Sequence, residues 1–133
     1  MNEQNLGIAQ QLLEKIGAGA PPAEVAALVS EDISFEIPGD ETALPWIGKK
    51  VGRQAFADFI RDQREMLVSN AFQVDDILVS DTRAVILGEL SATIKQSGKV
   101  AETYFAIILT IADGLVVRFQ MLEDSFAASQ AAR

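Results

Sequence analysis

The sequence predicts an α+β fold of about three helices and five to six strands, with helices mainly in the first half of the chain and strands in the second. Apolar residues recur at helical spacing in the first half, whereas the second half contains four β-rich runs. Short turns that carry Ser, Asp and Gly separate these runs, which is typical of β-hairpins. Because short connections join antiparallel neighbours, we expect the runs to form an antiparallel meander.

The first helix is predicted over residues 5–16. Its apolar side chains recur at the spacing of one helix face: Leu6, Ala9, Leu12, Leu13 and Ile16. The GAGAPP segment then ends this helix, and Pro22 suits the first turn of a short second helix over 22–29. The ISFEIP segment that follows alternates apolar and polar residues, which predicts a half-buried strand that Pro38 closes.

The third helix is the best-defined helix in the sequence. It starts near Gly52 and carries a broad stripe made of Phe56, Phe59, Ile60, Gln63, Met66 and Leu67. A loop over residues 38–48 connects the first strand to this helix and contains Trp46, the only tryptophan. Two interpretations of Trp46 remain open: it hangs over the entrance of a pocket, or it caps a small core under the loop.

The β-rich runs span residues 71–80, 83–95, 100–112 and 115–123. Asp124 and Ser125 follow the last run and are expected to cap a final helical turn. The third run contains YFAIILTI, which is apolar on both faces, so that both faces need cover. A second copy of the sheet supplies this cover most simply and predicts a homodimer. A strand in the centre of a thick core is the alternative.

Length and charge limit the class of protein. At 133 residues the chain has the size of one domain, which we expect to span residues 1–133. A net charge of −8 disfavours nucleic acid and anionic membrane surfaces as partners. The sequence contains neither an apolar run long enough to span a bilayer nor the basic start and apolar run of a secretory signal. We therefore expect a cytoplasmic location.

The absence of two residue types restricts the chemistry. Without cysteine or histidine, the chain has no thiolate or imidazole nucleophile, base or metal ligand. Acid–base chemistry must therefore use Asp, Glu, Tyr or Lys. The acidic segments SED (30–32) and LED (122–124) lack the alternating ligands of a calcium loop. No metal ion or other cofactor is expected.

Three segments carry a resemblance to a known family: ALVSEDISFEIPG, WIGKKVGRQAFADFI and DGLVVRFQMLED. Together with the order of elements, they resemble the nuclear-transport-factor-two-like superfamily, and within it the SnoaL-like branch related to ketosteroid isomerase and polyketide cyclases. This resemblance implies a cystatin-like roll, in which a cone of curved antiparallel sheet wraps around the long third helix. It also implies a pocket between the concave face of the sheet and the helices, and homodimerisation through the convex face.

The resemblance also identifies positions where ketosteroid isomerase has its functional groups. Its base at the end of the first strand corresponds to Ile37, and the tyrosine of its first helix corresponds to Leu13. Its protonated acid corresponds to Ala106 or Ile107. Since these positions are apolar here, steroid isomerisation by that mechanism is not expected. Catalysis is left open, with a ligand-binding protein and an interaction module whose pocket is filled by its own side chains as alternatives.

The pocket is expected to bind a small apolar or polycyclic molecule. With Phe35 and Ile37 pointing inward, the two-residue period of strands extends this lining onto the later strands. The expected ligand-binding residues are Leu13, Phe35, Ile37, Trp46, Phe56, Phe59, Ile60, Gln63, Leu90, Phe119 and Met121.

Glu123 and Tyr104 are the candidate catalytic residues. A carboxyl in apolar surroundings has a raised pKa and acts as an acid or base near neutral pH, so Glu123 suits that role. A solvated position at the rim is the alternative for Glu123. Tyr104 faces the pocket only if Ala106 rather than Ile107 points inward, and the sequence does not fix this phase. A packing role is the alternative for Tyr104.

Overall fold

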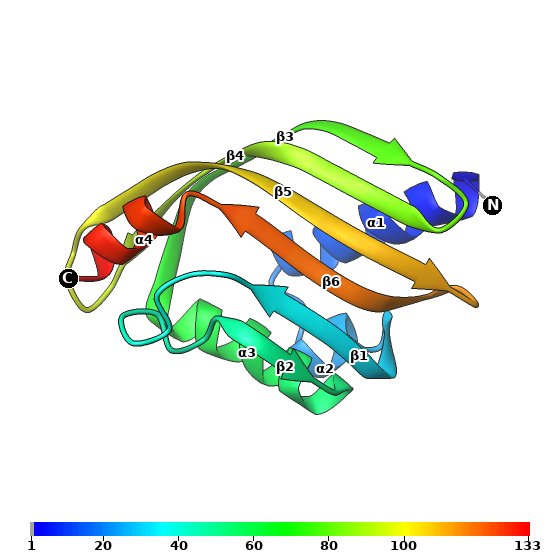
Figure 1. Ribbon diagram of the computed structural model, residues 1–133, viewed down its shortest axis with the longest axis horizontal. Coiled ribbons are helices and arrows are strands. Elements are labelled where there is room, and N and C mark those ends of the chain that lie inside the picture. The colour runs from blue at the N-terminus through cyan, green and yellow to red at the C-terminus, as the bar shows by residue number, and fades with distance from the viewer. Residues whose placement is uncertain (1) are drawn as a thin grey trace.

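Residues 2–133, which the computed structural model describes, form four helices and one curved six-stranded sheet that does not close on itself (Figure 1). This confirms the predicted α+β cone. The helices are α1 (Asn2–Gly17), α2 (Pro22–Ala26), α3 (Arg53–Met66) and α4 (Ser125–Ala132). The strands are β1 (Val29–Ile37), β2 (Gly48–Val51), β3 (Leu67–Val79), β4 (Arg83–Ile94), β5 (Val100–Ala112) and β6 (Leu115–Glu123).

The strand order of the sheet is β2-β1-β6-β5-β4-β3. Strands β3 to β6 form the antiparallel meander that the short turns predicted. In contrast, β1 runs parallel to β6, with Phe35 opposite Phe119. The first strand therefore lies beside the last one, and β2 pairs antiparallel with the other edge of β1.

Several element boundaries differ from those predicted. The second helix ends at Ala26, and β1 begins at Val29 rather than at Ile33. Val29 is fully buried and lies opposite Val116 of β6, so pairing between distant segments decides its conformation. At the end of α3, Leu67 has an extended backbone with φ −126° and ψ 149°. Its assignment to the helical stripe was therefore wrong, because β3 starts there.

Strand β2 was not predicted, because its sequence GKKV was assigned to the loop and to the start of the third helix. Lys49 lies opposite Glu36 of β1, and the two side chains form an ion pair of 3.3 Å. Short, lysine-rich strands are common at sheet edges, where charge discourages pairing with other chains. Gly52 follows with φ 111°, a backbone conformation that favours glycine, and directs the chain into α3.

The pairing of β3 with β4 is irregular at two points. The register of this pair shifts twice, between Ser69 and Ala71 and between Val74 and Asp76. Gly88 lies on β4, opposite Val74 of β3 and Phe105 of β5, and an added Cβ there would stand 2.0 Å from the carbonyl oxygen of Gln73. The close approach of the three strands at this point therefore requires glycine.

Helices α1 to α3 lie behind the sheet in Figure 1, on its concave side. α1 buries Ile8, Ala9 and Leu12 against the sheet. Its buried Asn5 side chain donates a hydrogen bond of 2.9 Å to the carbonyl oxygen of Ser80, which fixes the helix to the β3–β4 turn. No helix within residues 2–133 is long and apolar enough to cross a membrane.

The chain continues after β6 into α4, which lies at one end of the sheet beside the β1–β2 connection (Figure 1). The Asp124 side chain accepts a hydrogen bond of 3.0 Å from the amide of Ala127, so the predicted N-terminal cap is confirmed. The helix it begins is longer than the single turn that was expected, since it extends from Ser125 to Ala132.

Candidate functional site

A cavity of about 380 Å³ lies between the concave face of the sheet and the helices. Side chains from α1, α3, α4, the 38–47 loop and strands β1, β3, β4, β5 and β6 line it. Most of the predicted ligand-binding residues belong to this lining: Leu13, Ile37, Trp46, Phe59, Ile60, Gln63, Leu90, Phe119 and Met121. The two-residue period of the strands therefore placed the wall of the cavity correctly on β4 and β6.

Phe35 and Phe56, which the sequence also placed among the ligand-binding residues, do not line the cavity. Both rings are fully buried and meet edge to face, with centroids 5.5 Å apart. Phe56 also packs against Phe119 at 5.5 Å, and Phe35 packs against Phe59 at 5.7 Å. The first two rings thus form a layer behind Phe59 and Phe119, which face the cavity.

Trp46 is only 5% exposed and forms part of the cavity wall together with Leu44 and Ile47 of the same loop. The loop backbone is held by hydrogen bonds from Leu44 N to Asp40 O (2.9 Å) and from Ile47 N to Leu44 O (3.2 Å). Trp46 therefore closes the core under the loop and also borders the cavity.

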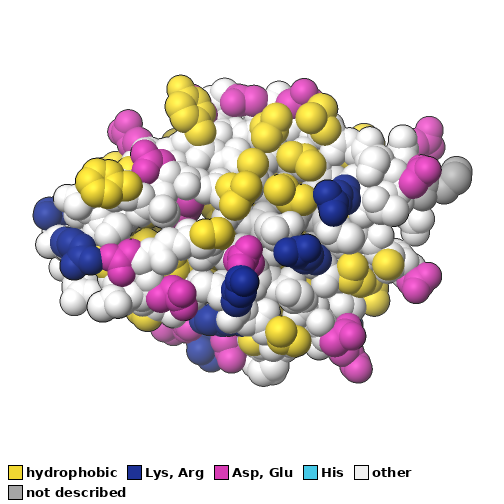
Figure 2. Space-filling view, in the orientation of Figure 1, with side chains coloured by type: hydrophobic (Ala, Val, Ile, Leu, Met, Phe, Trp, Pro, Cys, Tyr) yellow, Lys and Arg dark blue, Asp and Glu magenta, His cyan; other side chains and the backbone are white. Residues whose placement is uncertain are grey.

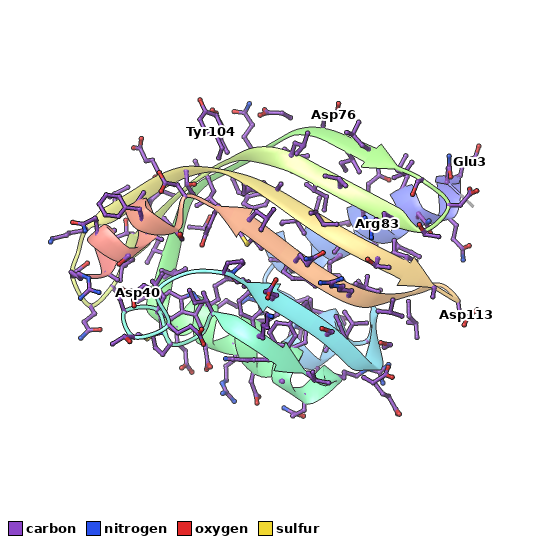
Figure 3. The ribbon with its side chains drawn as sticks, viewed as in Figure 1. Glu3, Asp40, Asp76, Arg83, Tyr104 and Asp113 are labelled. Atoms are coloured by element: carbon purple, nitrogen blue, oxygen red, sulfur yellow. The ribbon has the colours of Figure 1, made fainter. Side chains whose placement is uncertain are left out.

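The phase of β5 places Tyr104 outside the cavity. Ala101, Thr103 and Ile107 line the cavity, whereas the Tyr104 side chain is 75% exposed. Figure 3 shows Tyr104 pointing away from the molecule on the convex side of the sheet. The alternative in which Ala106 faces inward is therefore wrong, and with it the placement of Tyr104 as a catalytic group of the pocket.

Glu123 lies at the end of β6, half-buried, and belongs to the cavity lining. Burial raises the pKa of its carboxyl above the usual value, and the neighbouring charge of Asp124 raises it further. A carboxyl in this environment keeps its proton to higher pH than a solvated one. It can therefore donate a hydrogen bond or a proton to a ligand, and accept a proton once it is ionised.

The lining also contains polar residues that were not predicted: Ser69, Ser91 and Thr103. Thr103 was missed because the phase of its strand was open, and Ser69 because β3 begins earlier than the predicted residue 71. The Thr103 hydroxyl accepts a hydrogen bond of 2.7 Å from the amide of Asp124 and donates one of 2.7 Å to the carbonyl oxygen of Tyr104. The Thr103 hydroxyl is thus already hydrogen-bonded to backbone groups of β5 and of the β6–α4 junction.

Arg64 is a further lining residue that was not predicted. Its guanidinium donates hydrogen bonds to the carbonyl oxygens of Ala20 and, at 3.3 Å, of Ile16. These contacts satisfy backbone groups at the end of α1 and hold the α1–α2 connection against α3. Among residues 2–133, no group of three or more acidic side chains is arranged to hold a metal ion.

The family model described as the SnoaL-like domain matches residues 9–119. Among solved structures, an NTF2-like protein from Burkholderia xenovorans LB400 is similar, with a TM-score of 0.90 at 20% identity, covering 100% of this chain and 98% of that chain. A protein from Xanthomonas campestris, named provisionally as a polyketide cyclase, has a TM-score of 0.78 at 16% identity, with 99% and 98% covered.

A Bacillus subtilis protein, named provisionally as an isomerase, has a TM-score of 0.78 at 18% identity, with 98% of this chain and 95% of that chain covered. Among curated proteins, none matches this sequence. At these identities, the similarity to solved structures establishes the fold.

Proposed function

Because this chain belongs to the SnoaL-like domain family, we propose that it binds a small apolar molecule in the cavity between the sheet and the helices. One observation carries the proposal: a cavity of about 380 Å³ whose walls are mostly carbon and whose lining contains one carboxyl group, Glu123. Ligand sites are commonly clefts of roughly 300–1,000 Å³ lined by apolar side chains with few polar groups.

The reaction class that fits this cavity best is proton transfer by Glu123. Because the pKa of this carboxyl is raised, it keeps its proton to higher pH than a solvated carboxyl, and it can donate that proton to a bound ligand or accept one when ionised. The names of the Xanthomonas and Bacillus proteins, polyketide cyclase and isomerase, belong to this broad class of chemistry.

Binding without catalysis is the second candidate, and a specific observation favours it. Leu13, Ile37 and Ile107 all line the cavity, and these are positions at which ketosteroid isomerase has its functional groups. The cavity therefore has aliphatic side chains at the positions where that enzyme has a base, a tyrosine and a protonated acid. A turnover that depends on Glu123, lost in E123Q with ligand affinity retained, separates the enzyme from the binding protein.

Ligand binding is tested with N-phenyl-1-naphthylamine, a neutral probe whose fluorescence rises in apolar surroundings. Leu90 lines the cavity, so L90W fills it and is expected to weaken probe binding at least about tenfold. The neighbouring Glu89 is exposed on the other face of β4, which makes E89W the matched control. Equal probe binding by L90W and the wild type, with both folded by circular dichroism, contradicts the proposal. Competition by a metabolite library then identifies the ligand.

We also propose that two copies of the chain pair through the convex face of the sheet. Leu78 of β3, Tyr104 of β5 and Leu122 of β6 are 52%, 75% and 46% exposed. Ile108 lies on β5 four residues after Tyr104 and therefore shares its face. Figure 2 shows a group of apolar side chains gathered on this face. Pairing would remove these side chains from water. Light scattering should give the mass of a dimer for the wild type and of a monomer for L122E; a monomeric wild type contradicts pairing.

A further inference from the structure

We propose that α4 and the 38–47 loop together form a gate at one end of the cavity, and that Asp40 is the positioning residue that holds this gate closed. The inference rests on the proposed function in one respect, since a gate matters only if a ligand enters. It concerns access to the cavity rather than the chemistry within it.

The two parts of the gate both contribute to the cavity wall and contact each other. Ala128 of α4 and Trp46 of the loop line the cavity. An added Cβ at Gly39 would lie 2.8 Å from Cδ1 of Ile47 and 3.3 Å from Cβ of Ser125. The loop therefore packs directly against the start of α4, and either part can clear this end of the cavity only if their contact opens.

Hydrophobic burial holds α4 only weakly. The side chains that it buries are small, namely those of Ala128, Ser129 and Ala131. Its largest side chain, Phe126, is 71% exposed. Since the stabilisation from burial scales with the apolar area removed from water, these small side chains contribute little. Polar contacts must therefore supply much of the attachment.

Asp40 provides the contact that joins the two parts. Its Oδ2 accepts a hydrogen bond of 2.9 Å from the Ser129 hydroxyl and also binds the guanidinium of Arg133. Its Oδ1 accepts hydrogen bonds from the amides of Thr42 (3.2 Å) and Ala43 (3.3 Å) within the loop. One carboxylate thus shapes the loop with one oxygen and holds α4 with the other; Figure 3 shows it beside the C-terminal end of the chain.

The other end of α4 is fixed differently. The amide of Asp124, which precedes the helix, donates a hydrogen bond of 2.7 Å to the Thr103 hydroxyl of β5. Near the far end, the Ser97 hydroxyl donates to the carbonyl oxygen of Ala131. The start of the helix is therefore anchored to β5 through a backbone amide, whereas its second half is held through the side chains of Ser129, Arg133 and Ser97. This arrangement suits a motion that pivots near Asp124.

The first test uses Trp46, the only tryptophan of the sequence, as a reporter. The double variant S129A/R133A removes both partners of Asp40 Oδ2 and leaves the loop contacts of Oδ1 in place. If the gate opens more often, acrylamide quenching of Trp46 fluorescence should increase about threefold to fivefold, as expected for the loss of one hydrogen bond and one exposed ion pair. R133A alone, which changes an exposed residue, should give a smaller increase in the same direction.

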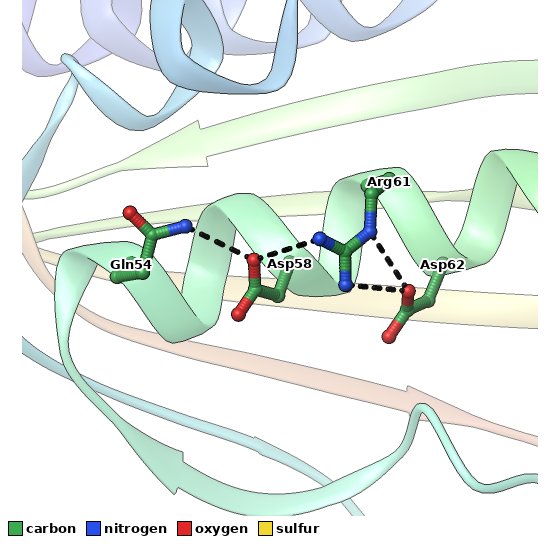
Figure 4. Close-up of polar contacts among 4 residues, drawn as sticks. All are labelled: Gln54, Asp58, Arg61 and Asp62. Carbon is green, nitrogen blue, oxygen red and sulfur yellow. Dashed lines mark hydrogen bonds and ion pairs between the residues drawn. The ribbon is translucent and has the colours of Figure 1, made fainter.

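The matched control is R61A on α3. Arg61 forms a comparable exposed set of contacts, to Asp58 at 3.3 Å and to Asp62 at 3.1 Å, away from the gate (Figure 4). Its loss should leave Trp46 quenching unchanged. Wild-type quenching in both S129A/R133A and R133A overturns the proposal, and so does an equal increase in R61A.

The second test measures the binding kinetics of N-phenyl-1-naphthylamine by stopped flow. A gate that must open for both entry and exit raises the association and dissociation rates of S129A/R133A by the same factor, with the dissociation constant within about twofold of the wild type. Unchanged rates overturn the gate. Failure of the wild type to bind the probe counts against the proposed function, while the quenching of Trp46 still decides whether Asp40 closes the cavity.

Discussion

Replacement of Gly88 by alanine tests whether the cavity depends on the close packing of β3 and β5 against β4 at this position. A Cβ at this position would lie 2.0 Å from the carbonyl oxygen of Gln73 on β3. It would also lie 2.7 Å from Cζ of Phe105 on β5, whose ring stacks on Phe72 at 4.7 Å. Since one of these partners is backbone, the methyl group fits only if β3 moves away.

The cost of G88A follows from these contacts. Overpacking costs about 1–3 kcal/mol, and a weakened β3–β4 hydrogen bond adds about 1 kcal/mol. We therefore expect a loss of about 3 kcal/mol in the free energy of unfolding. With an unfolding entropy of about 2.1 cal/mol/K per residue over 133 residues, the melting temperature falls by about 10 °C.

Thermal unfolding followed by circular dichroism measures this effect, and G7A is the matched control. Gly7 lies within α1, and an added Cβ there meets nothing within 4 Å. Alanine at that position is expected to stabilise the helix by about 0.5–1 kcal/mol. The same chemical change should thus have opposite signs at the two positions. A G88A variant whose free energy of unfolding lies within about 0.5 kcal/mol of the wild type refutes the argument from close strand packing.

Three further predictions concern single side chains. Burial raises the pKa of Glu123 in the folded state above its unfolded value, so this group favours folding at low pH and loses that contribution as pH rises through the folded pKa. In urea titrations, E123Q should therefore gain stability relative to the wild type as the pH rises above the ordinary carboxyl pKa of 4.5. Y104F should leave probe affinity unchanged, since Tyr104 lies outside the cavity; a tenfold loss contradicts that placement. F56A should cost about 3–5 kcal/mol in chemical unfolding, because it removes the centre of the aromatic layer, and a cost below about 1 kcal/mol contradicts its structural role.

The sequence was sufficient to predict the order of the elements other than β2, and much of the cavity wall. Turn residues mark the ends of the meander strands, and these local signals do not depend on the rest of the fold. On β6, the alternation from Phe119 through Met121 to Glu123 fixes which side chains share a face. That alternation brought Glu123 to the cavity without any knowledge of the other strands.

Other features depend on contacts between distant segments and were not predictable. In β5, YFAIILTI is apolar at both parities, so the outward position of Tyr104 follows from its pairing opposite Glu89 rather than from the pattern. Strand β2 is short and charged, and only its pairing with β1 makes it a strand. The contact between Asp40 and Ser129 joins residues far apart in the sequence, and no local pattern indicates it.

The most direct test of the central claim is energy transfer from Trp46 to bound N-phenyl-1-naphthylamine in the wild-type protein. Trp46 lies in the cavity wall, so a probe bound in the cavity lies close to its indole ring. We predict saturable quenching of Trp46 emission with one probe per chain, together with enhanced probe fluorescence. Probe fluorescence that increases without quenching of Trp46, or no binding at all, would contradict a ligand site between the sheet and the helices.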